Sequence, residues 1–81
     1  MYSMSGKKTN ESQSRRIAEI SSLIRNWRIN DNMTLADFSQ VAGTHPNSIY
    51  NLEHQRVDII TLFKCIDATG LTLSEFFDGI D

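Results

Sequence analysis

Residues 33–53 read MTLADFSQVAGTHPNSIYNLE, and this stretch decides how the chain folds. Thr34 can cap the first turn of a helix with its hydroxyl, and Gly43 supplies the left-handed residue that commonly ends one. Pro46 then suits the first position of a second helix, because its φ is fixed and it has no N–H to satisfy. The stretch therefore predicts two short helices joined by a tight turn.

Helical signals continue on both sides of this stretch. Upstream, apolar residues three and four positions apart predict an amphipathic helix over residues 14–30. Downstream, Asp58 is expected to cap a fourth helix that ends at Gly70. Residues 72–75 read TLSE, a capping box that predicts a fifth helix running to Gly79. No segment alternates with the period of two typical of a half-buried strand, so the predicted fold class is all-α with five helices.

The apolar residues of each segment predict which of its faces is buried. The expected inward residues are Ile17, Ile20, Ile24 and Trp27, then Leu35, Phe38, Val41 and Ala42, then Ile49 and Leu52, then Ile59, Leu62, Phe63 and Ile66. Cys65, on the predicted fourth helix, is expected to be a small buried hydrophobe.

Length and composition exclude several classes of protein. A chain of 81 residues, 40% apolar and 22% charged, makes one domain, and it has no apolar run that could span a membrane. Residues 1–10 lack the apolar stretch of a signal peptide, and one cysteine fits a reducing compartment, so a cytoplasmic location is expected. Cys65, His45 and His54 lack the spacing of a zinc site. No nucleophile–base pair or phosphate-binding loop is recognisable, so we expect neither an enzyme nor a cofactor.

Charge is distributed unevenly along the chain. Residues 1–28 hold six basic residues and two acidic ones, whereas residues 29–81 hold two basic and eight acidic ones. We therefore expect a flexible basic arm over residues 1–13, with residues 14–81 as the folded domain. A basic segment of this kind favours an anionic partner.

Residues 23–77 resemble the lambda-repressor-like, Cro-type (XRE-like) helix-turn-helix DNA-binding family. The resemblance rests on residues 33–53 and on the closing run GLTLSEFF at residues 70–77. It implies a five-helix lambda-repressor-like domain, here with an N-terminally extended first helix. It also implies a transcriptional regulator, expected to be a repressor, that binds a palindromic operator in double-stranded DNA as a homodimer.

The resemblance assigns roles to individual residues around a recognition helix at about residues 46–54. The implied base contacts are Asn47, Ser48, Tyr50 and Asn51, whose amide and hydroxyl groups suit base edges in the major groove. The expected phosphate contacts are Thr34, Thr44, His45, Arg56 and Arg25. Gln55 stands where the family usually has the glycine that ends this helix.

Glu53 lies four residues after Ile49 and so shares the inward edge of the recognition helix. A carboxylate there needs a cationic partner, because an unpaired buried charge is costly. The resemblance supplies Arg28, at the end of the first helix, as the other half of a structural pair.

Two questions stay open at the level of sequence. The first is the dimer interface, for which the candidates are Phe76, Phe77, Ile80, Ile17 and Ile20, apolar residues near the ends of the domain. The second is an alternative function, because the same fold can serve as a protein-interaction module of the antitoxin or antirepressor type. The acidic residues after position 28, and Leu35 where the family commonly has a glutamine, favour that module and a basic protein partner.

Overall fold

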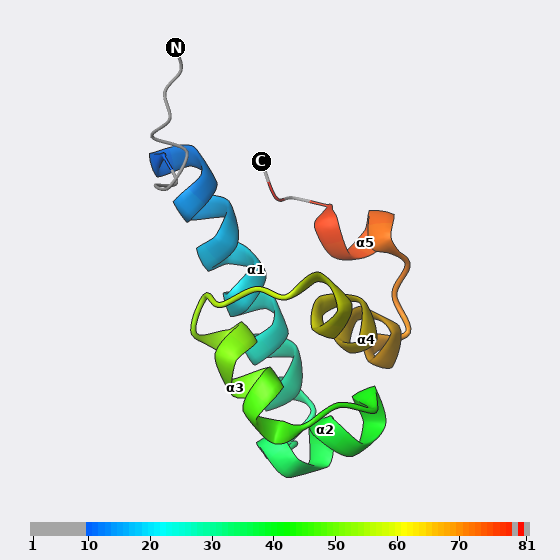
Figure 1. The fold of residues 1–81 in the computed structure, drawn as a ribbon. Coiled ribbons are helices and arrows are strands. Elements are labelled where there is room, and N and C mark those ends of the chain that lie inside the picture. Colours follow the sequence, from blue (N-terminus) through cyan, green and yellow to red (C-terminus); the bar gives the residue numbers. More distant parts are fainter. Residues whose placement is uncertain (1–9, 79, 81) are drawn as a thin grey trace.

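The computed structural model describes residues 10–78 and residue 80, and the regular structure within them is entirely helical. The elements are α1 (Glu11–Asn30), α2 (Leu35–Ala42), α3 (Pro46–Glu53), α4 (Ile59–Thr69) and α5 (Leu73–Phe77). Helices α2 and α3 lie beside the C-terminal half of α1, and α5 lies at the other end of the molecule, beyond α4 (Figure 1). The all-α prediction with five helices is confirmed. Among these helices none is both long and apolar enough to cross a membrane.

Local hydrogen bonds fix where the helices begin. At α2, Thr34 Oγ1 accepts the backbone N–H of Asp37 at 3.0 Å, and Asp37 Oδ2 accepts that of Thr34 at 3.1 Å. At α4, Asp58 accepts the backbone N–H of Thr61 at 2.9 Å and its hydroxyl at 3.0 Å. These bonds favour the charged carboxylate and hold the pKa of Asp58 below its usual value. Both starts agree with the sequence prediction.

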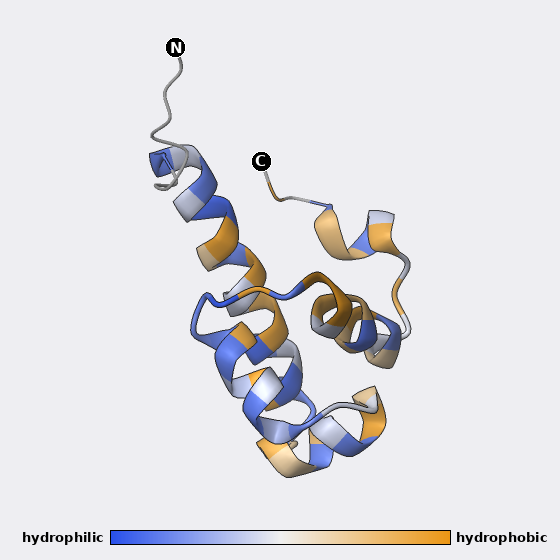
Figure 2. Cartoon of the chain, in the orientation of Figure 1, coloured by the Kyte–Doolittle hydropathy of each residue, from blue (hydrophilic) through white to orange (hydrophobic). Residues whose placement is uncertain are grey.

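Helix α1 begins three residues earlier than the predicted start at Ser14. Asn10 Oδ1 accepts the backbone N–H of Gln13 at 2.8 Å, and Gln13 Oε1 accepts that of Asn10 at 3.2 Å. This capping box opens the helix at Glu11. The prediction was wrong because it relied on apolar periodicity, and the first turns of α1 are polar (Figure 2).

Two further predictions concern the ends of the chain. Of the predicted arm over residues 1–13, residues 1–9 lie outside the described residues, whereas residues 10–13 cap and open α1. The fifth helix was predicted to run to Gly79, which also lies outside the described residues. The structure ends α5 at Phe77.

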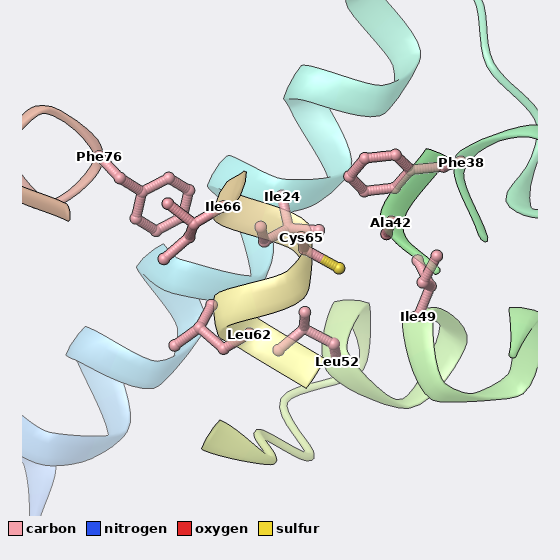
Figure 3. Packing of buried hydrophobic residues seen from close by; sticks show 9 residues of the cluster. All are labelled: Ile24, Phe38, Ala42, Ile49, Leu52, Leu62, Cys65, Ile66 and Phe76. Carbon is pink, nitrogen blue, oxygen red and sulfur yellow. The ribbon is translucent and has the colours of Figure 1, made fainter. Parts of the chain in front are cut away.

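Among the described residues, nine buried apolar side chains form a core to which all five helices contribute. They are Ile24, Phe38, Ala42, Ile49, Leu52, Leu62, Cys65, Ile66 and Phe76 (Figure 3). Trp27 of α1 packs against this cluster, and its ring lies 5.6 Å from that of Phe38, centroid to centroid. Burial raises the pKa of the Cys65 thiol to about 11, so the thiol stays protonated at neutral pH. The predicted burial of Cys65 is confirmed.

The inward face of α2 differs from the predicted one by one residue. Val41, expected in the core, is 54% exposed, whereas Ser39 is buried. Ser39 and Val41 lie equally far from the centre of the inward stripe that Phe38 and Ala42 define, on opposite sides of it, on a helix of 3.6 residues per turn. Periodicity therefore does not decide between them, and the packing of the neighbouring helices buries Ser39. The hydroxyl of Ser39 is satisfied by donation to the carbonyl of Ala36 at 2.7 Å. A polar residue therefore occupies an inward position where the hydropathy pattern indicated valine.

The inward face of α4 is rotated relative to the predicted one. Ile59 and Phe63, expected in the core, are 57% and 43% exposed. Thr61, which was not expected in the core, is buried on the same side as Leu62 and Cys65. The sequence offers two overlapping apolar stripes on this helix, and the prediction combined residues of both. It is confirmed for Leu62, Cys65 and Ile66 and wrong for Ile59 and Phe63.

Gln55 ends α3 by adopting the left-handed conformation, with φ of 68°. Its backbone N–H donates to the carbonyl of Leu52 at 3.2 Å, and that of Arg56 donates to the carbonyl of Asn51 at 2.9 Å. These two bonds are those of a Schellman motif, in which a glycine usually takes the left-handed position. Helix α3 thus ends with the backbone geometry that a glycine usually provides. The Cβ of Gln55 makes this left-handed conformation unfavourable.

Replacing Gln55 with glycine is expected to stabilise the domain. Glycine removes the steric penalty that the Cβ of Gln55 has in the left-handed conformation, and this gain exceeds the entropy that a glycine adds to the unfolded chain. Gln55→Gly should therefore raise the free energy of unfolding by about 0.5–1 kcal/mol. Urea denaturation followed by circular dichroism measures the change. Gln55→Ala keeps the Cβ and is the control, which should give no gain. Equal stabilities for the two variants would contradict this account of the α3 terminus.

Candidate functional site

The inner side of α3 is tied to α1 by a two-point ion pair. Arg28 Nε donates to Glu53 Oε2 at 2.7 Å, and Arg28 Nη2 donates to Glu53 Oε1 at 3.0 Å. Only 14% of the Arg28 side chain and 3% of the Glu53 side chain are exposed. The hydrogen bond to Glu53 raises the pKa of Arg28 above its usual value. The structure brings these two residues together as the resemblance implied.

The third donor of Arg28 reaches a different element. Its Nη1 donates to the backbone carbonyl of Met33 at 2.9 Å, in the turn between α1 and α2. One guanidinium therefore joins the end of α1, the start of α2 and the end of α3. Because a guanidinium is planar and presents its donors in a fixed fork, this arrangement limits how α3 can rotate.

A second contact between α1 and α3 lies two turns earlier on α1. The hydroxyl of Ser21 donates to the backbone carbonyl of Leu52 at 2.6 Å, and both residues are buried. Leu52 and Ile49 point their side chains into the core (Figure 3). Sequence reasoning did not identify Ser21, although a serine on an otherwise apolar stripe was the available signal.

The outer side of α3 carries the four predicted base contacts. Asn47 and Tyr50 are exposed, and Ser48 and Asn51 are half-buried. Arg56 Nη1 donates to Asn51 Oδ1 at 3.3 Å. An arginine can only donate, so this bond fixes which atom of the Asn51 amide is the oxygen and how the amide is oriented.

Histidines occupy both ends of α3, and their Nδ1 atoms have opposite roles in hydrogen bonds to the backbone. At the start, His45 Nδ1 accepts the backbone N–H of Asn47 at 3.0 Å, so Nδ1 carries no proton and Nε2 remains a donor. At the end, His54 Nδ1 lies 2.7 Å from the carbonyl of Tyr50, which can only accept, so here Nδ1 carries the proton. The His54 ring also stacks on the Tyr50 ring, with centroids 4.0 Å apart.

The predicted phosphate contacts lie on three different elements. Thr34 uses its oxygen to cap α2, which leaves its hydroxyl proton free to donate. Thr44 and His45 lie in the turn before α3, and Arg56 follows its last turn. Arg25 is exposed on α1, four residues after Ser21 and three before Arg28, and therefore lies on the side of α1 that meets α3.

The predicted dimer contacts are largely used inside the chain. Phe76 is part of the core, and its ring meets that of Phe77 edge-on with centroids 5.1 Å apart. Ile20 and Phe77 also pack against the core, and Ile17 is half-buried. Ile80 borders a pocket of about 360 Å³ formed with the outer face of α1 and lined by Arg15, Ala18, Glu19, Ser22, Leu23, Asn26, Asp78 and Ile80. The homodimer itself stays a prediction.

Among the residues that the structure describes, no three histidine, cysteine, aspartate or glutamate side chains are grouped so that they could hold a metal ion. The pocket beside Ile80 is lined by no residue of α2, α3 or α4 and so is separate from the outer face of α3. No family model matches this chain, and no curated protein or solved structure gives a significant match.

Breaking the Arg28–Glu53 pair is expected to destabilise the domain strongly. Arg28→Met leaves a buried carboxylate without its partner, and Glu53→Leu leaves a guanidinium in the same position, so each should cost about 3 kcal/mol of unfolding free energy. The double variant removes both charges and should cost much less than the sum of the two. A double-mutant cycle from urea denaturation measures the coupling. Additive losses would show that the pair does not couple α1 to α3.

Proposed function

We propose that this chain is a sequence-specific DNA-binding regulator of transcription, acting as a repressor, in which α2, the turn and α3 form a lambda-repressor-like helix-turn-helix. The observation that carries this proposal is that α3 is bonded to α1 on one side and presents polar side chains to solvent on the other. Its inner side is held to α1 through Glu53 and the Leu52 carbonyl, while its outer side presents amide and hydroxyl groups. A helix held in this way can enter a major groove with its base-contacting side chains already in position.

The chemistry of the outer face suits base edges. An asparagine amide can bind adenine through two hydrogen bonds, one donated and one accepted. Asn51 is pre-oriented for this by its bond from Arg56, and its oxygen retains a second lone pair. Asn47, Ser48 and Tyr50 add further donors and acceptors beside it.

Affinity in this proposal comes from a few contacts to phosphate. The hydroxyl of Thr34, the Nε2–H of His45 and the guanidinium groups of Arg56 and Arg25 are the donors, with Thr44 in the turn before α3. Few cations are involved, so the affinity is expected to fall less steeply with salt than that of a strongly basic repressor. A homodimer would place two copies of α3 in successive major grooves, about 34 Å apart.

Selection from random duplex DNA at two salt concentrations tests the proposed function. We expect enrichment of an inverted repeat whose half-sites are centred about one helical turn apart. Recovery of no motif, together with binding that disappears at modest salt, would contradict sequence-specific recognition.

Asn51→Ala is expected to weaken binding to the selected site by about 1–3 kcal/mol and to relax the preference at one base pair. Binding to an unrelated duplex should change little, because phosphate contacts are kept. Fluorescence anisotropy with a panel of single-base variants of the site measures both effects. An equal loss of affinity for all duplexes would show that Asn51 does not contact a base.

Arg56 and Arg25 form a matched pair for separating affinity from preference. Either alanine variant removes one cation and should reduce the slope of log affinity against log salt by about one. Only Arg56→Ala also releases the Asn51 amide, so it alone should broaden the preference at the base pair that Asn51 reads. The same panel of duplexes, titrated at several salt concentrations, distinguishes the two. Identical preference profiles for both variants would contradict the positioning role of Arg56.

A second function is favoured by the exposed carboxylates. Asp31, Asp37, Asp67, Glu75 and Asp78 are all exposed, and they spread over the domain rather than gathering near α3. Such a surface suits a basic protein partner, as in an antitoxin or antirepressor. Failure of the DNA selection, with salt-sensitive binding to a basic protein, would support this alternative.

A further inference from the structure

The pocket beside Ile80, which we call the α1 pocket, has a volume of about 360 Å³. Part of its lining is a row of α1 residues spaced four, three and four positions apart, which therefore share one face of the helix: Arg15, Glu19, Ser22 and Asn26. The lining also includes Asp78 and Ile80, from the segment after α5. Small-molecule sites typically begin at about 300 Å³, so the α1 pocket is large enough for a small organic ligand.

The segment after α5 is held in place by backbone hydrogen bonds. The N–H of Asp78 donates to the carbonyl of Glu75 at 3.4 Å, and that of Ile80 donates to the carbonyl of Phe77 at 3.0 Å. The side chain of Phe77 packs in turn against the core. In Figure 1, α5 lies at the same end of the molecule as the first half of α1, away from α2. Two segments that are distant in sequence thus form the α1 pocket.

Glu19 is half-buried, and one of its carboxylate oxygens has no hydrogen-bond donor among the described residues. This oxygen, Oε1, is enclosed by protein atoms, and even Arg15, one turn earlier on α1, does not donate to it. A charged oxygen that solvent cannot reach and no donor satisfies costs free energy. A positive charge bound in the α1 pocket beside Glu19 would offset this cost.

The rest of the lining favours a cation that carries an apolar group. Glu19 and Asp78 contribute two negative charges and Arg15 contributes one positive charge, so the ionisable side chains of the lining have a net charge of −1. Apolar surface beside these charges is supplied by Ala18, Leu23 and Ile80. An anion would meet two carboxylates in this pocket, and a fully polar cation would leave the apolar surface uncovered.

We propose that the α1 pocket binds a small organic cation, in which an amine or amidine is attached to a compact apolar group. The cation lies against Glu19, and the side-chain oxygens of Ser22 and Asn26 accept further hydrogen bonds from it. The apolar group covers Leu23 and Ile80. No residue of α2, α3 or α4 lines the α1 pocket, so this inference goes beyond the proposed binding of DNA and does not rest on it.

Benzamidine is the probe for this site, because it joins an amidinium to a phenyl ring, and benzamide is its neutral counterpart of similar shape. Titration of the isotope-labelled full chain, followed by NMR, should show saturable shifts for benzamidine at the residues that line the α1 pocket. A Kd of about 1 mM or tighter is expected for a ligand of so few atoms. Benzamide should bind about tenfold more weakly, because its hydrogen bonds to Glu19 carry no positive charge. Equal binding of the two probes would overturn the proposal.

Glu19→Gln removes the charge and keeps the shape of the side chain, so it should weaken the binding of benzamidine about tenfold and not that of benzamide. Glu11→Gln is the matched control, since Glu11 is exposed on the same helix outside the lining. It lies about 12 Å from Glu19 along the helix axis, beyond the Debye length at physiological salt, so its replacement should leave binding unchanged. Circular dichroism verifies that both variants fold. Equal effects of the two variants, or shifts that map outside the α1 pocket, would contradict the assigned site.

Discussion

The bidentate pair between Arg28 and Glu53 is the constraint on which the arrangement of the other helices depends. Glu53 is almost fully buried, so its charge requires a partner, and Arg28 is the residue that α1 brings to it. The same guanidinium holds the Met33 carbonyl, which places the start of α2. A pair of this kind adds little net stability compared with apolar residues of similar shape, but it disfavours arrangements that separate its members. Its main effect is to define one orientation of α3 relative to α1.

That orientation determines what α3 presents to solvent. With Leu52 in the core and its carbonyl bonded to Ser21, the amides of Asn47 and Asn51 lie on the outer side. Histidines at both ends extend this surface, each with a tautomer set by a backbone group that can only donate or only accept. The outer face is thus polar, ordered by hydrogen bonds and supported by a rigid base. A helix that contacts base edges needs these properties, and they are the basis of the proposed binding of DNA.

Helix α4 is apolar on two sides, and the fold covers only one of them. Leu62, Cys65 and Ile66 complete the core, whereas Ile59 and Phe63 remain outside it. The domain is too small to cover a helix that is apolar on both sides, because α5 is only five residues long and its buried anchor, Phe76, meets the inward side.

The sequence by itself determined most helix boundaries and the pairing of Glu53 with a cation. Caps such as Thr34, Asp58 and Gly43 act through hydrogen bonds and dihedral angles within three or four residues, so they can be recognised locally. Arg28 and the outer face of α3 were anticipated from a resemblance, which carries spatial information that periodicity lacks. The tertiary structure alone decided which apolar stripe of α4 is buried and that Gln55 would take a left-handed conformation. Burial depends on where neighbouring helices are placed, and Gln55 keeps its unfavourable backbone conformation because the two bonds that end α3 hold it there.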